Sequence, residues 1–311
     1  MATPASFNGS TGVRPAFLGS LLIVLAAAGF SSKSIWIKFA YAAPEAIEPI
    51  TLMTLRMLFA LPFFVAVAIW RPGPVPESLR ARDGLSILWL GLLGYYLASW
   101  LDFSGLQYLS ASLERLILFL YPTFVVLLTA LLYRRAIPRV QAAALLVSYV
   151  GMLLLFAMTD TGGPTAAELT GALLVLASAM SFALYMTGAG HVMKRFGSRR
   201  FTAWTMSVAC LATVGHFLLT QSPQQLLVSP RVVLLGLVLA LVSTVAPAFL
   251  MNAGIQRLGA ARASIISAVG PVLTLLMAWI WLGETMGPLQ LLGGALVIGG
   301  VLAVSGSRVN S

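Results

Sequence analysis

Long apolar runs follow one another along nearly the whole chain, and only short polar connections separate them. A helix needs about 20 mainly apolar residues to cross the hydrocarbon core of a bilayer. Ten runs of about this length predict transmembrane helices over residues 17–41, 47–70, 83–103, 107–133, 138–158, 168–192, 200–220, 231–253, 258–282 and 288–306. We therefore expect an all-α integral membrane protein with ten transmembrane helices.

One sequence motif occurs twice at a constant spacing. Residues 105–122 run from a Gly through a Gln and a Leu to a Pro, and residues 254–271 repeat these positions 149 residues later. The same register continues without a gap to Gln141 and Gln290. A long period of this kind indicates a duplicated architecture and is sought before local structure is interpreted.

The duplication predicts two homologous halves, residues 17–158 and residues 168–306, with five spans each. Because five is an odd number, equivalent spans of the two halves cross the membrane in opposite directions. The expected architecture is therefore a pair of inverted five-helix repeats. In carriers, such repeats exchange conformations around a site near the bilayer midplane and so produce alternating access.

The composition agrees with a membrane protein and excludes other classes. Only 9% of the 311 residues are charged and 59% are hydrophobic, whereas soluble domains contain roughly 25% charged residues. The net charge of +10 does not indicate a nucleic-acid partner, because the basic residues lie in short connections and not in one patch. The single Cys210 allows neither a disulfide framework nor a cysteine metal site.

The distribution of basic residues predicts the orientation. If the N-terminus is cytoplasmic, 14 of the 19 basic residues lie on cytoplasmic segments and the outer connections hold only Arg231. Acidic residues such as Glu45 and Glu48 lie on the outer connections. Because Lys and Arg are enriched on the cytoplasmic side, we expect a multi-pass protein of the cell (inner) membrane with both termini in the cytoplasm.

Several motifs resemble those of the EamA branch of the drug/metabolite transporter superfamily. They are Leu55–Ala60, Leu106–Ala111, and the C-terminal run from Pro271 through Trp281-Leu-Gly-Glu284 to Val301. The resemblance covers residues 17–306 and implies a ten-helix carrier whose central cavity is lined mainly by spans 1, 3, 4, 6, 8 and 9. Such carriers mostly export amino acids or other small metabolites. The first half has Arg135 where the second has Glu284, which argues against a symmetric role for Glu284.

Charged residues inside spans are candidates for substrate binding, because a charge at a helix centre costs at least about 2.5 to 3.5 kcal/mol unless it faces a cavity or a partner. The candidates are Lys33, Arg56 and Glu114, accompanied by Arg115 and Asp102. We expect them to form a polar layer in the outer half of the first repeat, with a net positive field for a substrate carboxylate. The alternative is that they pair among themselves or extend to the interface.

Aromatic residues form a second group of candidates. On the third span, Tyr96 and Trp100 share one helix face, and Tyr95 and Ser99 share another. Tyr185 lies on the sixth span. These residues are predicted to line the cavity, although Trp100, near a span end, is also typical of an interfacial aromatic belt.

Prolines inside spans predict kinks. On the eighth span, Pro247 frees an upstream carbonyl that the hydroxyl of Ser243 or Thr244 can satisfy. Ser243 and Thr244 are also candidates for substrate binding. Pro122 and Pro271 occupy equivalent positions in the repeated motif. They are interpreted either as elements that shape the spans or as hinges for gating.

No phosphate-binding loop, metal-binding pattern or catalytic motif is present, so we expect no cofactor, no metal and no enzymatic activity. The favoured function is a secondary transporter that exports small metabolites, above all amino acids, with aromatic or hydrophobic ones preferred. The alternatives are a passive facilitator or channel and a multidrug exporter of hydrophobic compounds. Glu114 is the candidate for proton coupling, and the sequence leaves monomer and homodimer open.

Overall fold

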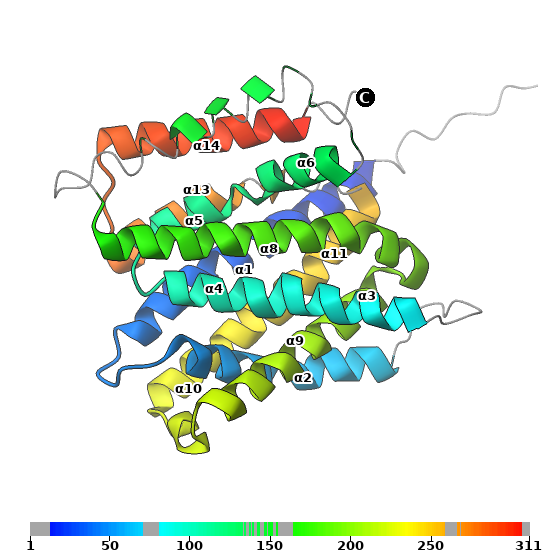
Figure 1. The fold of residues 1–311 in the computed structure, drawn as a ribbon, viewed down its shortest axis with the longest axis vertical. Coiled ribbons are helices and arrows are strands. Elements are labelled where there is room, and N and C mark those ends of the chain that lie inside the picture. The colour runs from blue at the N-terminus through cyan, green and yellow to red at the C-terminus, as the bar shows by residue number, and fades with distance from the viewer. Residues whose placement is uncertain are drawn as a thin grey trace, which may run out of the picture.

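A computed structural model describes residues 13–70, 81–132, 164–258 and 269–306, with single positions between 134 and 154 and at 266 and 267. The described residues form helices, turns and short connections and contain no strand. The helices lie side by side as a bundle, with α8 at the front and α1 behind it in Figure 1. The predicted all-helical fold class is confirmed for this part of the chain.

The described helices of the first half cover four of the predicted spans. They are α1 (Val13–Tyr41), α2 (Pro49–Trp70), α3 (Ala81–Gly91), the π-helical turn η1 (Leu92–Leu97), α4 (Ala98–Gly105), α5 (Ala111–Leu118) and α6 (Tyr121–Leu132). The third span is therefore α3, η1 and α4 in succession, and the fourth span is divided into α5 and α6.

The described helices of the second half repeat this order. They are α8 (Ala166–Phe196), α9 (Ser198–Thr220), the 3-10 turn η2 (Pro223–Leu226), α10 (Pro230–Ala240), the π-helical turn η3 (Leu241–Val245), α11 (Ala246–Leu258), α13 (Val269–Met277), the π-helical turn η4 (Ala278–Leu282) and α14 (Pro288–Gly306). The start of α8 is capped by its own sequence. Thr165 and Glu168 form a capping box, which satisfies backbone donors there.

The described helices include seven that are long and apolar enough to cross a membrane: Phe17–Tyr41, Pro49–Trp70, Ala81–Gly105, Ala111–Leu132, Ala166–Ala189, Ser198–Thr220 and Pro230–Met251. Two shorter apolar helices cover Val269–Leu282 and Leu291–Gly300. The protein is thus a multi-pass membrane protein. Ten spans stay a prediction, since most of the span expected at 138–158 and the start of the span expected at 258–282 lie outside the described residues.

Helices in the two halves begin at the spacing found in the sequence motif. The offset of 149 residues relates the start of α2 to that of α9 (49 and 198) and the start of η1 to that of η3 (92 and 241). The third and eighth spans therefore both widen into a π-helical turn at the same place. Insertions of this kind are rare inside α-helices and are frequent at functional sites.

The packing of the helices follows the same correspondence. In the first half α1 packs against α11 and α13, and its counterpart α8 packs against α4 and α6. The second helices of the two halves, α2 and α9, pack against each other. The first helix of each half thus packs against the third and fourth spans of the other half.

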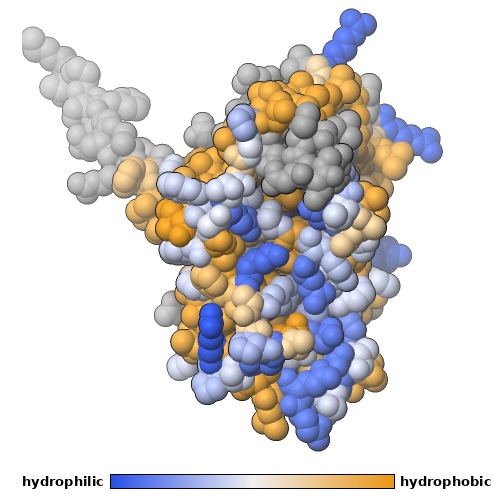
Figure 2. Space-filling view, turned by 90° about the vertical axis from the view of Figure 1, so that its left-hand side faces the viewer, coloured by the Kyte–Doolittle hydropathy of each residue, from blue (hydrophilic) through white to orange (hydrophobic). Residues whose placement is uncertain are grey.

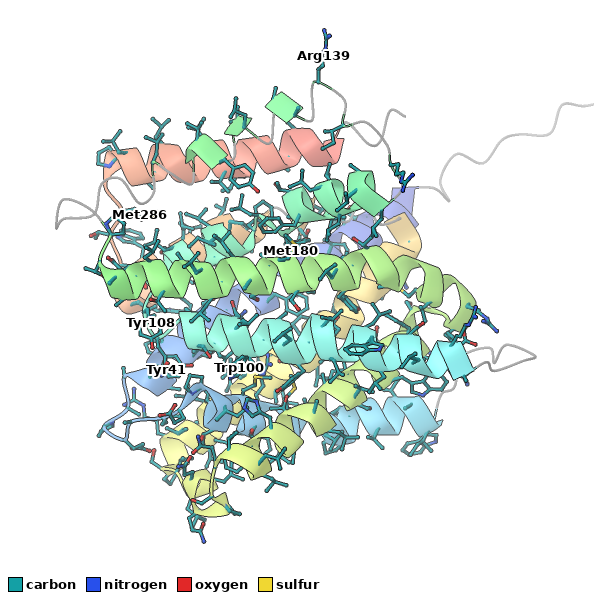
Figure 3. All side chains as sticks on the ribbon, viewed as in Figure 1. Tyr41, Trp100, Tyr108, Arg139, Met180 and Met286 are labelled. Carbon is teal, nitrogen blue, oxygen red and sulfur yellow. The ribbon has the colours of Figure 1, made fainter. Side chains whose placement is uncertain are left out.

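One end of the bundle is rich in polar residues. The connections between α1 and α2 and between α4 and α5 lie at the left-hand end of Figure 1, as does the start of α14. We call this the α1–α2 end. Figure 2 looks onto it and shows hydrophilic residues at its centre with hydrophobic residues beside them. The side chains of Tyr41, Tyr108 and Met286 lie near this end (Figure 3).

Candidate functional site

The centre of the candidate site is a run of polar side chains on the first helix, Ser31, Ser32, Lys33 and Ser34, which we call the polar stretch. Successive residues of an α-helix point about 100° apart, so these side chains face different neighbours. Ser31 donates a hydrogen bond to the carbonyl of Gly270 on α13 at 2.8 Å. The hydroxyls of Ser32 and Ser243, on η3, are 3.0 Å apart. Two residues of the polar stretch thus join α1 to the second half.

The other two residues of the polar stretch join α1 to acids of the first half. Lys33 Nζ forms an ion pair with Asp102 Oδ2 on α4 and lies 3.7 Å from Glu114 Oε1 on α5. Ser34 donates a hydrogen bond to Glu114 Oε2 at 2.6 Å. The exposed fractions of the Lys33, Asp102 and Glu114 side chains are 13%, 3% and 0%. The structure therefore brings three of the predicted polar residues together in one buried cluster.

Arg56 is also buried, but it lacks such partners. It is 4% exposed on α2, and its guanidinium lies 4.7 Å from the centroid of the Phe103 ring. Among the described residues, Nε and Nη2 of Arg56 have no hydrogen-bond partner. A guanidinium interacts favourably with an aromatic face, yet this contact leaves its donors unsatisfied. Arg56 is therefore a buried cation that forms no ion pair with a described residue, although Asp102 is near enough to interact with it electrostatically.

Arg115 follows Glu114 on α5 and extends toward α13. A Cβ atom on Gly270 would lie 2.8 Å from Arg115 Nη2 and 3.4 Å from Ser31 Oγ. Glycine at position 270 therefore leaves room for the guanidinium beside the polar stretch. Nε of Arg115 has no hydrogen-bond partner among the described residues.

The described charges of this region do not balance. Three cations, Lys33, Arg56 and Arg115, accompany two acids, Asp102 and Glu114, and the acids are paired with Lys33. Neither arginine forms an ion pair with a described residue. A formal charge of about +1 is thus left in a region where an uncompensated charge is costly.

An aromatic row connects this region to the sixth span. Ring centroids are 5.1 Å apart for Tyr121 and Phe182, 5.6 Å for Phe182 and Tyr185, and 5.0 Å for Tyr185 and Tyr95. The Tyr185 hydroxyl donates to the Tyr95 hydroxyl at 3.3 Å. Tyr121, at one end of the row, is near enough to Arg115 to interact electrostatically. Tyr95 and Tyr185 are thus adjacent, as two members of a continuous row.

Tyr96 and Trp100 face a different helix. The Tyr96 hydroxyl is 3.0 Å from Nδ1 of His216 on α9, and the Trp100 and His216 ring centroids are 5.5 Å apart. Trp100 lies on α4 beside the lower helices in Figure 3. Sequence reasoning placed Tyr96 and Trp100 on one face but missed His216, because no sequence signal relates positions 120 residues apart. Ser99, on α4, is half-buried.

The interruption of the eighth span begins before its proline. The π-helical turn η3 ends at Val245, and Pro247 is the second residue of α11. The Thr244 hydroxyl donates to the carbonyl of Leu239 at 2.9 Å, which satisfies an acceptor where the helical ladder changes. A Cβ atom on Gly29 would lie 2.5 Å from Pro247 Cγ. Glycine at position 29 thus permits close packing of α1 on this turn.

The two prolines of the repeated motif both lie within described helices. Pro271 is on α13, next to Gly270, and Pro122 is the second residue of α6, after a break at Phe119 and Leu120. Proline is tolerated in the first turn of a helix because its missing donor would have no partner there. Their action as hinges stays a prediction.

Glu284 has a role that sequence reasoning missed. Its carboxylate accepts hydrogen bonds from the backbone N–H groups of Ala111 and Ser112, at 2.8 and 3.0 Å, and from the Ser112 hydroxyl at 2.7 Å. These donors belong to the first turn of α5. An acid is stabilising at a helix N-terminus. The Leu-Gly-Glu motif of the second half therefore holds the helix that carries Glu114 and Arg115.

A cavity of about 500 Å³ opens at the α1–α2 end. Its lining comes from the α1–α2 connection, the start of α2 and the segment around η2: Glu45, Ala46, Ile47, Glu48, Thr51, Gln225, Leu227, Val228 and Ser229. The N–H of Ser229 donates to Glu45 Oε1 at 3.0 Å. Hydrogen bonds from Ser229 lower the pKa of Glu45 from its ordinary value, because they stabilise the charged form.

Comparisons with known proteins agree with this picture. The sequence pattern of the EamA-like transporter family matches residues 17–157 and 169–306. The chain is 33% identical to the uncharacterized transporter YcbK of Bacillus subtilis over 290 residues, 90% of each chain. It is 27% identical over 245 residues to a protein of Streptantibioticus cattleyicolor named a probable terminal-alkyne amino-acid exporter, covering 78% of this chain and 80% of that one.

A solved structure has the same fold. This crystal structure of a protein with 18% sequence identity superposes with a TM-score of 0.65 and covers 94% of this chain and 99% of its own.

Proposed function

Because the chain belongs to the EamA-like transporter family, whose members are transporters and not enzymes, we propose that it is a secondary carrier that exports amino acids, with aromatic and hydrophobic ones favoured. The observation that carries this proposal is the unbalanced positive charge in the membrane-spanning region. A relative of similar length is named an amino-acid exporter, which supports the same substrate class.

The charge argues for a substrate that carries a carboxylate. Arg56 and Arg115 both have unsatisfied donors and form no ion pair with a described acid. Arginine presents a planar fork of donors that binds a carboxylate in a bidentate manner. The carboxylate of a bound amino acid would pair with one of these guanidinium groups, although the zwitterion as a whole adds no net charge. In the folded protein Lys33 does not compete for it, because Lys33 is already paired with Asp102.

The aromatic row supports an aromatic side chain on the substrate. Tyr121, Phe182, Tyr185 and Tyr95 follow one another from the neighbourhood of Arg115. Aromatic rings prefer edge or offset contacts with one another, so an aromatic side chain of the substrate can take a place along this row. Binding of the carboxylate at Arg115 would direct the rest of the molecule toward it.

The transport mechanism that we propose is alternating access between two inverted repeats of five helices, residues 17–158 and 168–306. The equal spacing of helix starts and the matching packing of α1 and α8 support this arrangement. Carriers built in this way move their halves around a central site. We further propose that the protein lies in the cell membrane with both termini in the cytoplasm, as its basic residues indicate.

Counterflow in proteoliposomes tests the function. Vesicles preloaded with unlabelled L-phenylalanine should accumulate labelled L-phenylalanine through the wild-type protein, without any ion gradient. The Arg115→Gln protein should lose this activity, whereas the Arg257→Gln protein should keep it, since Arg257 is exposed. Uptake of hydrophobic cations in place of amino acids would indicate a multidrug exporter. Equilibration that never exceeds the outside concentration would indicate a channel.

A further inference from the structure

A glycine of the second half adjoins the guanidinium of Arg115. The three atoms nearest to a Cβ added at Gly270 would be Arg115 Nη2 at 2.8 Å, Ser31 Oγ at 3.4 Å and Arg115 Cζ at 3.8 Å. Because non-bonded heavy atoms pack best at about 3.5 to 4.0 Å, any side chain at position 270 would have to displace the guanidinium. The missing side chain is therefore what allows Arg115 its present place.

The backbone at Gly270 is fixed by buried hydroxyl groups. The Gly270 carbonyl accepts hydrogen bonds from Ser31 at 2.8 Å and from Thr274 at 3.3 Å. The Thr274 hydroxyl also donates to the Ser31 carbonyl at 3.2 Å. Both hydroxyl residues are fully buried. Since these bonds tie α13 to α1, a methyl group at position 270 should move the long side chain of Arg115 and not the helix.

The equivalent residue of the first half also adjoins Arg115. By the offset of 149 residues, Gly270 corresponds to Tyr121, and Arg115 corresponds to Ser264. Tyr121 is near enough to Arg115 to interact electrostatically, and its side chain shares a hydrogen bond with Ser267. The repeated motif thus supplies a phenol from one copy and an unfilled space from the other. Both positions at which the copies differ in this way face the same guanidinium.

The part of Arg115 that lies at Gly270 is suited to a carboxylate. Nε and Nη2 form one edge of the planar guanidinium, and arginine binds a carboxylate through two parallel N–H groups. Nη2 is the atom nearest to the missing Cβ, and Nε has no hydrogen-bond partner among the described residues. Asp102 and Glu114 interact with Arg115 electrostatically, but no described acid forms an ion pair with it. Arg115 is only half-buried, so a ligand can reach this edge.

We propose that Gly270 is a positioning residue that sets the preference of the carrier for substrates with a carboxylate. It leaves the space in which the Arg115 guanidinium lies, so that the Nε–Nη2 edge is available to the carboxylate of the exported amino acid. A larger residue would shift the guanidinium and weaken this contact. None of the three atoms nearest to the added Cβ belongs to the aromatic row, so binding of the substrate ring would be kept. This inference rests on the proposed amino-acid export.

Binding measured with and without a carboxylate tests this role. Purified protein in detergent is titrated with L-phenylalanine and with L-phenylalaninol, which has a hydroxymethyl group in place of the carboxylate. The wild type should bind L-phenylalanine roughly tenfold to a hundredfold more tightly, as expected for a hydrogen bond between charged groups. In the Gly270→Ala protein the ratio of the two affinities should fall about tenfold. The affinity for L-phenylalaninol should change little.

Gly294→Ala is the matched control. Gly294 is on α14, and a Cβ there would lie 3.3 Å from Cδ1 of Leu116, the residue after Arg115 on α5. This substitution presses on the same helix without reaching the guanidinium, so it should keep the wild-type ratio. An unchanged ratio in Gly270→Ala would overturn the inference. An equal fall of the ratio in Gly294→Ala would also overturn it, because any pressure on α5 would then have the same effect.

A double variant keeps the test decisive if Gly270→Ala does not fold. Lysine ends one atom earlier than arginine, so the atom 2.8 Å from the added methyl group is absent in Gly270→Ala/Arg115→Lys. The melting temperature of this protein should be close to that of Arg115→Lys alone. Suppose instead that Gly270→Ala lowers the melting temperature equally in both backgrounds. Gly270 would then serve packing independently of Arg115, and the inference would be wrong.

The proposed function and this inference can be separated. An absence of counterflow with every amino acid removes the proposed function and the inference with it. Counterflow of L-phenylalanine together with a carboxylate preference that ignores Gly270→Ala removes only the positioning role. Counterflow together with a ratio that falls in Gly270→Ala and not in Gly294→Ala supports both.

Discussion

At the scale of single residues, buried charges of the same sign have different surroundings. Lys33 lies between two acids, whereas Arg56 contacts the ring of Phe103 and has two nitrogens without a hydrogen-bond partner among the described residues. A paired buried charge contributes to one defined arrangement, whereas the contact of Arg56 with the Phe103 ring offsets only part of the desolvation energy of its charge. Because Arg56 is retained despite that cost, we expect it to have a function.

Arg56→Met should therefore raise thermal stability and remove transport. Methionine fills a similar volume with apolar atoms, and replacing buried charges by apolar residues is often neutral or stabilising by about 1 to 4 kcal/mol. The melting temperature in detergent and L-phenylalanine counterflow measure the two effects. A less stable Arg56→Met protein with normal counterflow would show that Arg56 serves the fold alone.

The Glu45–Ser229 contact should depend on pH. Since the pKa of Glu45 is lowered in the folded protein, its charged form stabilises the fold above the unfolded pKa, and this contribution is lost as the pH falls through the lowered value. At neutral pH the Ser229 amide should exchange with deuterium faster in Glu45→Ala than in the wild type. The difference between the two proteins should disappear in acid. Equal exchange at neutral pH would contradict the contact.

At the scale of helices, the important features are ends and interruptions. Glu284 caps α5 from a segment 172 or more residues away in sequence, and π-helical turns interrupt the third and eighth spans at equivalent positions. Serines of α8 donate to carbonyls near η1, from Ser181 to Leu93 at 2.8 Å and from Ser178 to Ala98 at 2.7 Å. Side chains of neighbouring helices thus stabilise the interrupted ladder, as membrane helices require.

Loss of the Glu284 cap should weaken α5. Glu284→Ala removes three accepted hydrogen bonds and a favourable charge at the helix N-terminus, and a cost of about 1 to 2 kcal/mol is expected. Glu284→Gln keeps an acceptor without the charge and should lose less. Thermal unfolding in detergent measures both variants. Equal stability of Glu284→Ala and wild type would rule out the cap as a stabilising contact.

Close packing of α1 on η3 should depend on the glycine between them. An added methyl group at Gly29 would lie 2.5 Å from Pro247 Cγ and 2.7 Å from the Val242 carbonyl oxygen. Gly29→Ala should therefore destabilise the protein by about 1 to 3 kcal/mol through overpacking. Gly84→Ala is the control, since a Cβ there has no neighbour within 4 Å. A similar melting temperature for the two variants would show that α1 can move away without cost.

At the scale of the whole molecule, the proposed site is not symmetric between the two predicted repeats. The packing around α1 and α8 corresponds, but only α1 has the polar stretch: positions 180 to 183 of α8, which are equivalent by the offset of 149, are Met, Ser, Phe and Ala. The acids and Arg115 likewise belong to the first half. The corresponding packing of α1 and α8 agrees with a movement in which both repeats take part. The polar residues that occur only in the first repeat agree with a role in substrate selection.

The orientation of the molecule can be tested with single cysteines. In a Cys210→Ser background, Ser222→Cys places a thiol on the α9–α10 connection, and Arg199→Cys places one near the start of α9. A thiol reagent that does not cross membranes should label the Ser222→Cys protein in intact cells, and should label the Arg199→Cys protein only after the membrane is opened. The opposite result would invert the predicted topology.

Much of the architecture was predictable because the bilayer imposes local requirements. Each span must satisfy its own backbone and carry its own apolar surface, so hydropathy placed the helices α1, α2, α8 and α9 within a few residues of their bounds. The repeat was visible because both copies retain one register. The charged residues inside spans stood out for the same reason, and Lys33, Arg56 and Glu114 were named from sequence.

The partners of these residues were decided only by the tertiary structure. The rotation and depth of one helix against another decide which acid pairs with Lys33 and why Arg56 forms no ion pair. They also decide that His216 contacts Tyr96 and that Glu284 binds the start of α5. Packing between helices sets those quantities, and it involves residues far apart in the chain. The sequence by itself determined the spans, the duplication and the presence of buried charge, because these are local properties or repeats. The pairing of Lys33 with the two acids, and the single positive charge left over, came from the fold.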